Sequence, residues 1–137
     1  MIRFLPLVVA LFSVSAVQDS PAKKNMDGVY ELVSSRFEQL DWSSPGWKGM
    51  MIVKDGRCSR VYQEVSPDSE VSFHSNAGTV EYDGKISKMR IQFSNYRELV
   101  GVTFNNRVTW SPDRRTLTLS AVDEKNNFRE VWKRAEK

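Results

Sequence analysis

The sequence predicts an all-β protein, a closed eight-stranded antiparallel up-and-down barrel. Residues 116–122 alternate polar and apolar side chains, which is the period of a strand with one buried face and one solvated face. Asp-Gly turns at 55–56 and 83–84 each separate two strand-like runs, a strong hairpin signal. No helical period is long enough to cross between parallel strands, so neighbouring strands should pair antiparallel and close. A two-sheet sandwich is the main alternative, but it needs crossing connections that the sequence does not show.

The first 26 residues are expected to lie outside the barrel. Residues 1–16 combine Arg3, an apolar run and the small residue Ala16, the pattern of a secretory signal peptide. The apolar run is too short for a transmembrane span, which needs about 20 residues. Residues 17–26 read as a flexible polar leader, and 27–137 as one domain. We therefore expect a secreted or periplasmic protein without a transmembrane segment.

The first half of the domain is predicted to hold three strands. The first, 28–35, places Tyr30 and Leu32 on the inward face. The next two, 49–54 and 57–65, form a hairpin, because both positions of its Asp-Gly turn accept a positive φ angle.

The second half begins with another hairpin, formed by strands 77–82 and 85–94. In its second arm Met89, Ile91 and Phe93 alternate with polar residues, so they are expected on one buried face. The remaining expected strands are 100–110, 115–122 and 127–134.

Two long connections interrupt this pattern. The segment 36–48 is expected to be an irregular loop, and it carries Trp42 and Trp47. These indoles either cover the end of the core or act as a lid over a pocket mouth, since long loops in compact domains are often functional. The segment 66–76 is mostly polar, and it could hold a short helix or a partial strand.

Composition argues against several functional classes. The net charge is +3 and the basic residues are spread along the chain, whereas a nucleic-acid binder concentrates them in one stripe. The single cysteine, Cys58, cannot form an internal disulfide and reads as a buried apolar residue. The single histidine, His74, reads as a loop residue, and its spacing from Cys58 gives no support for a catalytic pair. We predict no metal, no cofactor and no catalytic residue, and a binding protein is favoured over an enzyme.

The last strand carries the most specific polar signal. Phe128, Glu130 and Trp132 share one face, so Glu130 should enter the barrel together with the two aromatic rings. A buried carboxylate must be paired, because burying it alone costs several kcal/mol. Arg107 or Arg90 is the expected partner. The pair would be a structural ion pair, an anchor for a polar ligand head group, or the centre of an acid–base step.

Three segments together resemble the lipocalin-like domains of the calycin group of β-barrels. The opening strand is similar to the family's Gly-x-Trp-x-Leu-x-Ser strand, with Tyr30 where the family has tryptophan. A Gly-Thr hairpin and a C-terminal meander that closes on Trp-x-Arg complete the resemblance. It implies a barrel, and often a hydrophobic ligand. The matching positions are 28–34, 77–85, 99–103, Arg107, 117–119 and 132–134.

The expected function is binding of a small apolar or amphipathic molecule inside the barrel, with segment 36–48 near its mouth. The alternative is a filled barrel that acts as an interaction module and binds a protein or envelope component through exposed aromatic residues. The predicted ligand-binding residues are Tyr30, Trp42, Trp47, Tyr62, Arg90, Phe93, Arg107, Trp110, Glu130 and Trp132. Further apolar residues expected inside are Leu32, Met50, Ile52, Phe104, Leu117 and Leu119.

Overall fold

The computed structural model describes residues 25–37, 40–43, 46–66 and 68–136. Its elements are β1 (Gly28–Phe37), β2 (Leu40–Ser43), β3 (Trp47–Lys54), β4 (Arg57–Val65), β5 (Val71–Tyr82), β6 (Ile86–Ser94), the 3₁₀ helix η1 (Arg97–Leu99), β7 (Thr103–Trp110), β8 (Thr116–Ala121) and β9 (Arg129–Arg134). Neighbouring strands pair antiparallel in the order β2-β1-β3-β4-β5-β6-β7-β8-β9, and β1 also pairs with β9. The predicted closed eight-stranded barrel is confirmed. β2 is an additional short strand that pairs with residues 34–37 at the end of β1. Among the described residues, no helix is long and apolar enough to cross a membrane.

The two predicted connections are largely strand, and in 66–76 the partial strand that the sequence allowed is the option that the structure confirms. In the segment 36–48, β1 runs on to Phe37 and turns back through β2 in a hairpin, and β3 already begins at Trp47. In the segment 66–76, β5 begins at Val71, opposite Val65 of β4. Both stretches become strands because each has a partner that satisfies its backbone hydrogen bonds.

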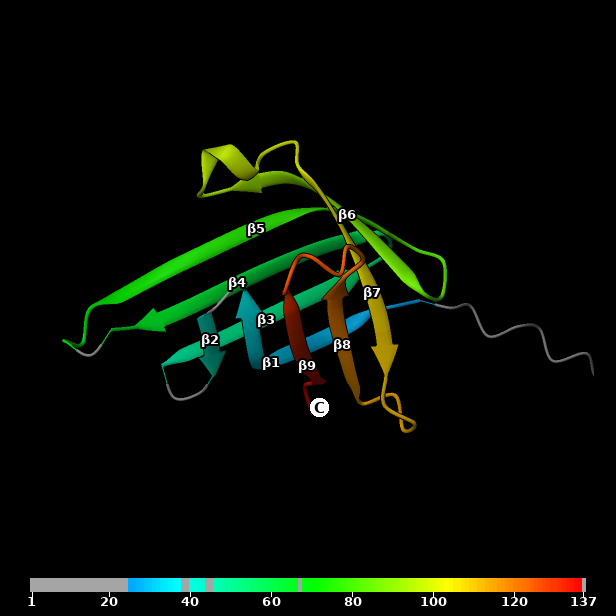
Figure 1. Ribbon diagram of the computed structural model, residues 1–137, viewed down its shortest axis with the longest axis horizontal. Helices are drawn as coiled ribbons and strands as arrows, with labels where there is room; N and C mark the ends of the chain where they lie inside the picture. Colours follow the sequence, from blue (N-terminus) through cyan, green and yellow to red (C-terminus); the bar gives the residue numbers. More distant parts are fainter. Residues whose placement is uncertain (1–24, 38–39, 44–45, 67, 137) are drawn as a thin grey trace, which may run out of the picture.

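Strands of unequal length give the barrel two different ends. Figure 1 shows that β3, β4 and β5 run well past the short strands β8 and β9. Trp47 of β3, Glu64 of β4 and Ser72 of β5 lie near the tips of these long strands, in the region that we call the projecting end.

The opposite end is closed by Tyr30 and Arg134. The Tyr30 hydroxyl donates a hydrogen bond to the Met26 carbonyl at 2.7 Å. The Arg134 guanidinium lies 5.1 Å from the centre of the Tyr30 ring and donates to its hydroxyl at 3.1 Å and to the Asp27 carbonyl at 3.0 Å. The Trp110 ring lies 6.4 Å from that of Tyr30. Met26 is buried, so ordered packing already includes the last residue of the predicted leader; residues 1–24, with the predicted signal peptide, lie outside the described residues.

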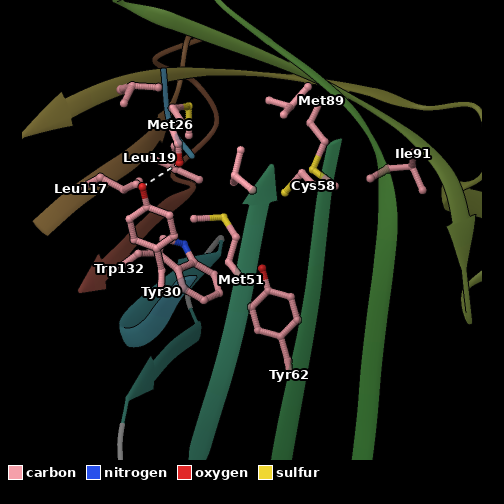
Figure 2. Close-up of a cluster of buried hydrophobic side chains, with 13 residues drawn as sticks. Met26, Tyr30, Met51, Cys58, Tyr62, Met89, Ile91, Leu117, Leu119 and Trp132 are labelled. Carbon is pink, nitrogen blue, oxygen red and sulfur yellow. Dashed lines mark hydrogen bonds between the residues drawn. The ribbon is translucent and has the colours of Figure 1, made fainter. Parts of the chain in front are cut away.

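The core fills the barrel beside this closed end (Figure 2). In β3 the prediction chose the wrong face: Met51 and Val53 point inward, and Met50 and Ile52 are 51% and 43% exposed. Both faces of β3 are apolar, so composition does not decide between them. The pairing of Met51 with the buried Tyr30 decides it, because directly paired residues share a face. The buried apolar side chains are Met26, Tyr30, Met51, Val53, Cys58, Tyr62, Val80, Met89, Ile91, Val108, Leu117, Leu119 and Trp132.

A β-bulge in β6 reverses the direction of Phe93. Ala77 pairs with Phe93 and Gly78 pairs with Ile91, so Gln92 is one extra residue. Phe93 therefore points outward and is 70% exposed, and the prediction that it shares the buried face of Ile91 is wrong. A Cβ atom on Gly78 would lie 1.8 Å from a main-chain oxygen of β6, so the close approach at the bulge requires glycine.

Candidate functional site

Glu130 is the centre of a buried polar cluster inside the barrel. The Tyr62 hydroxyl donates a hydrogen bond to Oε1 at 2.8 Å, and the Trp132 indole donates to Oε2 at 3.0 Å. Nη1 of Arg60 lies 3.3 Å from Oε2, and the Ser35 hydroxyl lies 3.5 Å from Oε1. We call these five residues the Glu130 cluster. Four donors surround one carboxylate, which satisfies the buried charge from several sides.

Two strand features bring the donors to Glu130. In β4, Cys58, Arg60 and Tyr62 alternate with exposed residues, so all three side chains point inward. In β1 the pairing with β9 shifts between Leu32 and Ser34, and the extra residue turns Ser35 inward, where it is 2% exposed. The cluster thus depends on one regular strand and one bulged strand.

Electrostatics keep the Arg60 guanidinium charged and the Tyr62 hydroxyl neutral. Desolvation lowers the pKa of the Arg60 guanidinium, but Tyr62 and Glu130 more than offset this effect, and the pKa is raised above its usual value. Burial raises the pKa of the Tyr62 hydroxyl well above 10, and Glu130 adds to the shift although Arg60 opposes it. Tyr62 is therefore a neutral donor at ordinary pH. The positive charge of Arg60 balances the negative charge of Glu130.

Arg60 is the member of the cluster with unused hydrogen-bonding capacity. Its Nε donates to the Asn76 side-chain oxygen at 3.1 Å, and its Nη1 contacts Glu130. Within the described part of the chain, Nη2 of Arg60 donates no hydrogen bond. This nitrogen is not fully buried. A guanidinium has five N–H donors in a fixed fork. The Arg60 side chain can therefore still donate to another group inside the barrel.

An aromatic stack extends from beside the cluster to Trp47 at the projecting end. The His74 ring stacks on Trp47, with centroids 5.4 Å apart, and on Tyr96, with centroids 5.1 Å apart. The Tyr96 hydroxyl contacts Nδ1, and Nε2 lies 3.7 Å from the Glu64 carboxylate. His74 belongs to β5 and pairs with Tyr62, so its prediction as a loop residue is wrong. This pairing places the stack directly beside the Glu130 cluster.

Some of the predicted ligand-binding residues do come together. Tyr62, Glu130 and Trp132 meet in the cluster, and Figure 2 shows the Tyr62 and Trp132 rings facing the core. Tyr30 and Trp110 pack together at the closed end, where the Tyr30 hydroxyl accepts a hydrogen bond from Arg134.

The other predicted residues have different positions. Trp47 joins the aromatic stack, and Trp42 is in β2, with its side chain outside the described residues. Arg90, Phe93 and Arg107 are exposed on the outer surface of the barrel. The prediction that Arg107 or Arg90 pairs with Glu130 is therefore wrong, because each sits on an outward position of its strand.

Sequence reasoning missed Arg60 and Ser35 of the Glu130 cluster, Asn76 beside it, and His74 and Tyr96 of the aromatic stack. Arg60 had a usable signal, because it lies two residues from both Cys58 and Tyr62, which were expected inside. Ser35 had none, since its direction depends on a bulge. Asn76 falls in the predicted connection 66–76, and in the structure it is a β5 residue paired with Arg60.

Cys58 and His74 do not form a catalytic pair. Cys58 pairs with Gly78, which is four residues along β5 from His74. Four residues of strand span about 13 Å, far beyond hydrogen-bond reach. Burial also raises the pKa of the Cys58 thiol, so this cysteine is held in its unreactive protonated form.

Comparisons with known proteins give no family assignment. No protein-family model matches the chain, and a search of curated proteins finds no match. The lipocalin-like resemblance of the sequence therefore stays a prediction, and the functional argument starts from the geometry of the site.

Proposed function

We propose that the protein binds a small amphipathic molecule inside the barrel, between the Glu130 cluster and the projecting end. The observation that carries this proposal is the free donor capacity of Arg60 beside an aromatic stack. Ligand sites are mostly apolar, with a few placed polar groups that fix orientation. The resemblance to lipocalin-like barrels supports the same proposal.

The charge balance of the cluster favours an uncharged polar end on the ligand. Arg60 and Glu130 already neutralise each other, with side chains only 5% and 4% exposed. A carboxylate or sulfonate would add a second buried negative charge without a second cation, at a cost of several kcal/mol. A hydroxyl, carbonyl or amide oxygen would accept from Arg60 without this cost.

The apolar body of the ligand would lie along the inner faces of β3, β4 and β5. Leu32 and Tyr62 pack over Gly49 of β3, because an added Cβ there would lie 3.0 Å from Leu32 and 3.3 Å from Tyr62, and these two side chains form part of the inner wall. Trp47 and His74 continue this surface toward the projecting end. Aromatic and aliphatic walls of this kind suit a flat or chain-like hydrocarbon.

A matched pair of fluorescent probes tests the proposal. N-phenyl-1-naphthylamine is uncharged, and 1-anilinonaphthalene-8-sulfonate has the same rings with one added sulfonate. We expect the uncharged probe to bind at least about tenfold more tightly, the equivalent of about 1.4 kcal/mol. The double variant Arg60→Met/Glu130→Gln keeps the interior neutral but removes the donor, and it should weaken binding of the uncharged probe. Trp47→Ala should weaken it as well.

The control is Arg107→Gln/Arg129→Gln, which changes two exposed arginines and should leave binding of the uncharged probe unchanged. Wild-type binding by the double interior variant would contradict the proposal. So would the absence of any small molecule from protein purified from its own source and examined by native mass spectrometry, combined with no probe uptake. That result would favour a filled barrel that acts as an interaction module.

We also propose that the protein is secreted or periplasmic, with residues 1–16 removed as a signal peptide. The support is the charged start, the apolar run and the small residue Ala16. N-terminal sequencing of the protein from its own source tests this. A mature protein that still begins at Met1 would contradict it.

A further inference from the structure

One row of outward side chains crosses five strands of the barrel in register. Val29 of β1 pairs with Ile52, Ile52 with Ser59, Ser59 with Ala77, and Ala77 with Phe93 of β6. Directly paired residues share a face, so these side chains lie side by side on the outer surface. The row is large and apolar at both ends and small in the middle.

The small residues leave a hollow in this surface. It has a volume of about 230 Å³ and is lined by Ile52, Ser59, Ala77 and Phe93 among others. Sites for whole small molecules are usually about 300–1,000 Å³ and more enclosed, so this hollow fits part of a larger apolar surface. Further exposed apolar residues lie on the same strands, on outward positions: Met50, Val61, Val65, Val71 and Phe73.

A basic row runs beside the apolar row. Lys54 pairs with Arg57, Arg57 with Thr79, and Thr79 with Arg90. Lys54 has an ion pair with Asp27 at 3.4 Å. Within the described residues, Arg57 and Arg90 have no ion pair, although both are exposed. Two arginines thus present unbalanced positive charge next to exposed apolar side chains.

The whole outer face of β1, β3, β4, β5 and β6 is positively charged. Its exposed basic residues outnumber its acidic ones: Arg36, Lys48, Lys54, Arg57, Lys88 and Arg90 against Glu31 and Glu81. A second copy of the chain is a poor partner for such a face, because a two-fold dimer would place two positively charged surfaces against each other. A surface that is apolar inside and negatively charged at its boundary complements it.

We propose that this outer face docks on an anionic lipid bilayer, with Phe93 and Ile52 entering the interface and Arg57 and Arg90 contacting lipid phosphates. Apolar side chains flanked by basic ones are the usual elements of peripheral membrane binding. The bulge in β6 is what directs Phe93 outward, toward the bilayer. The inference is independent of ligand binding, because these side chains point away from the interior.

Flotation of the full chain with phosphatidylcholine vesicles, with and without phosphatidylglycerol, tests the proposal. We expect binding only when phosphatidylglycerol is present, and weaker binding as salt increases. Arg57→Gln/Arg90→Gln should lower vesicle affinity about thirtyfold, since each basic residue near an anionic surface contributes about fivefold. Ile52→Thr should lower it about fivefold.

The barrel supplies matched controls. Arg107 and Arg129 flank Ser120 of β8 as Arg57 and Arg90 flank Thr79, so Arg107→Gln/Arg129→Gln makes the same charge change on another side. Val122 is 41% exposed against 43% for Ile52, so Val122→Thr is the apolar control. Both controls should bind vesicles as the wild type does.

Equal losses in the test and control variants, or equal binding to both vesicle types, would overturn the proposal. So would wild-type protein that does not float, or that instead forms a dimer sensitive to Ile52→Thr in sedimentation velocity. Loss of vesicle binding with normal uptake of the uncharged probe would separate this surface from the interior site.

Discussion

Arg60→Met is the sharpest test of the Glu130 cluster. The change keeps a long apolar side chain but removes the positive charge from a site in which Arg60 is 4% exposed. Glu130 keeps its three neutral donors, Ser35, Tyr62 and Trp132, but its charge is no longer balanced. Breaking a buried ion pair from one side typically costs about 3–5 kcal/mol. Typical domains have only about 5–15 kcal/mol of stability, so the loss would be large.

A double-mutant cycle measured by urea denaturation isolates this pair. We expect Arg60→Met and Glu130→Gln each to lower the free energy of unfolding, and the double variant to lose clearly less than the sum of the two. The reason is that the second change removes the uncompensated charge left by the first. Additive losses would refute the reasoning, because they would mean that the two side chains do not depend on each other. If Arg60→Met does not fold, the comparison of Glu130→Gln with the double variant still decides the question.

Three further variants test other parts of the barrel. Burial raises the pKa of Tyr62 above its unfolded value of 10, so wild-type stability should fall as pH rises past 10. Tyr62→Phe should make that fall shallower by about 1.4 kcal/mol per pH unit in urea titrations. Gly78→Ala should lower the free energy of unfolding by more than about 3 kcal/mol or prevent folding. At Gly46 an added Cβ would have its nearest neighbour 3.9 Å away, so Gly46→Ala should change that free energy by no more than about 0.5 kcal/mol. Arg134→Met should lower the unfolding free energy by about 2 kcal/mol, since the side chain bonds to and stacks on Tyr30, and near-wild-type melting would contradict this.

The sequence predicted the barrel well because its hairpin signals are local. The Asp-Gly turns at 55–56 and 83–84 determine which strands are neighbours, and Asp55 and Gly56 do adopt positive φ angles. The pairing order follows from consecutive antiparallel hairpins. The extension of β1 was not predicted, and that of β5 was only one option, because residues at the end of a strand look like a loop until their partner strand is known.

The candidate site was predicted only in part, because it depends on the face that each strand turns inward. Glu130 was placed correctly, since it alternates with two aromatic residues. In β3, however, Met50 and Ile52 are as apolar as Met51 and Val53, and the inward face follows only from pairing with β1. Arg60 was overlooked because arginine is rarely buried, although a paired arginine can be.

Single extra residues explain why composition alone could not separate the interior from the outer surface. The bulge in β1 turns Ser35 toward Glu130, and the bulge in β6 turns Phe93 away from the core. Each bulge reverses the alternation for the rest of its strand, so a serine becomes buried and a phenylalanine becomes exposed. Both reversals contradict residue hydrophobicity, and each occurs where we propose a binding surface. Departures from simple burial rules often mark function, and here both have an identified geometric cause.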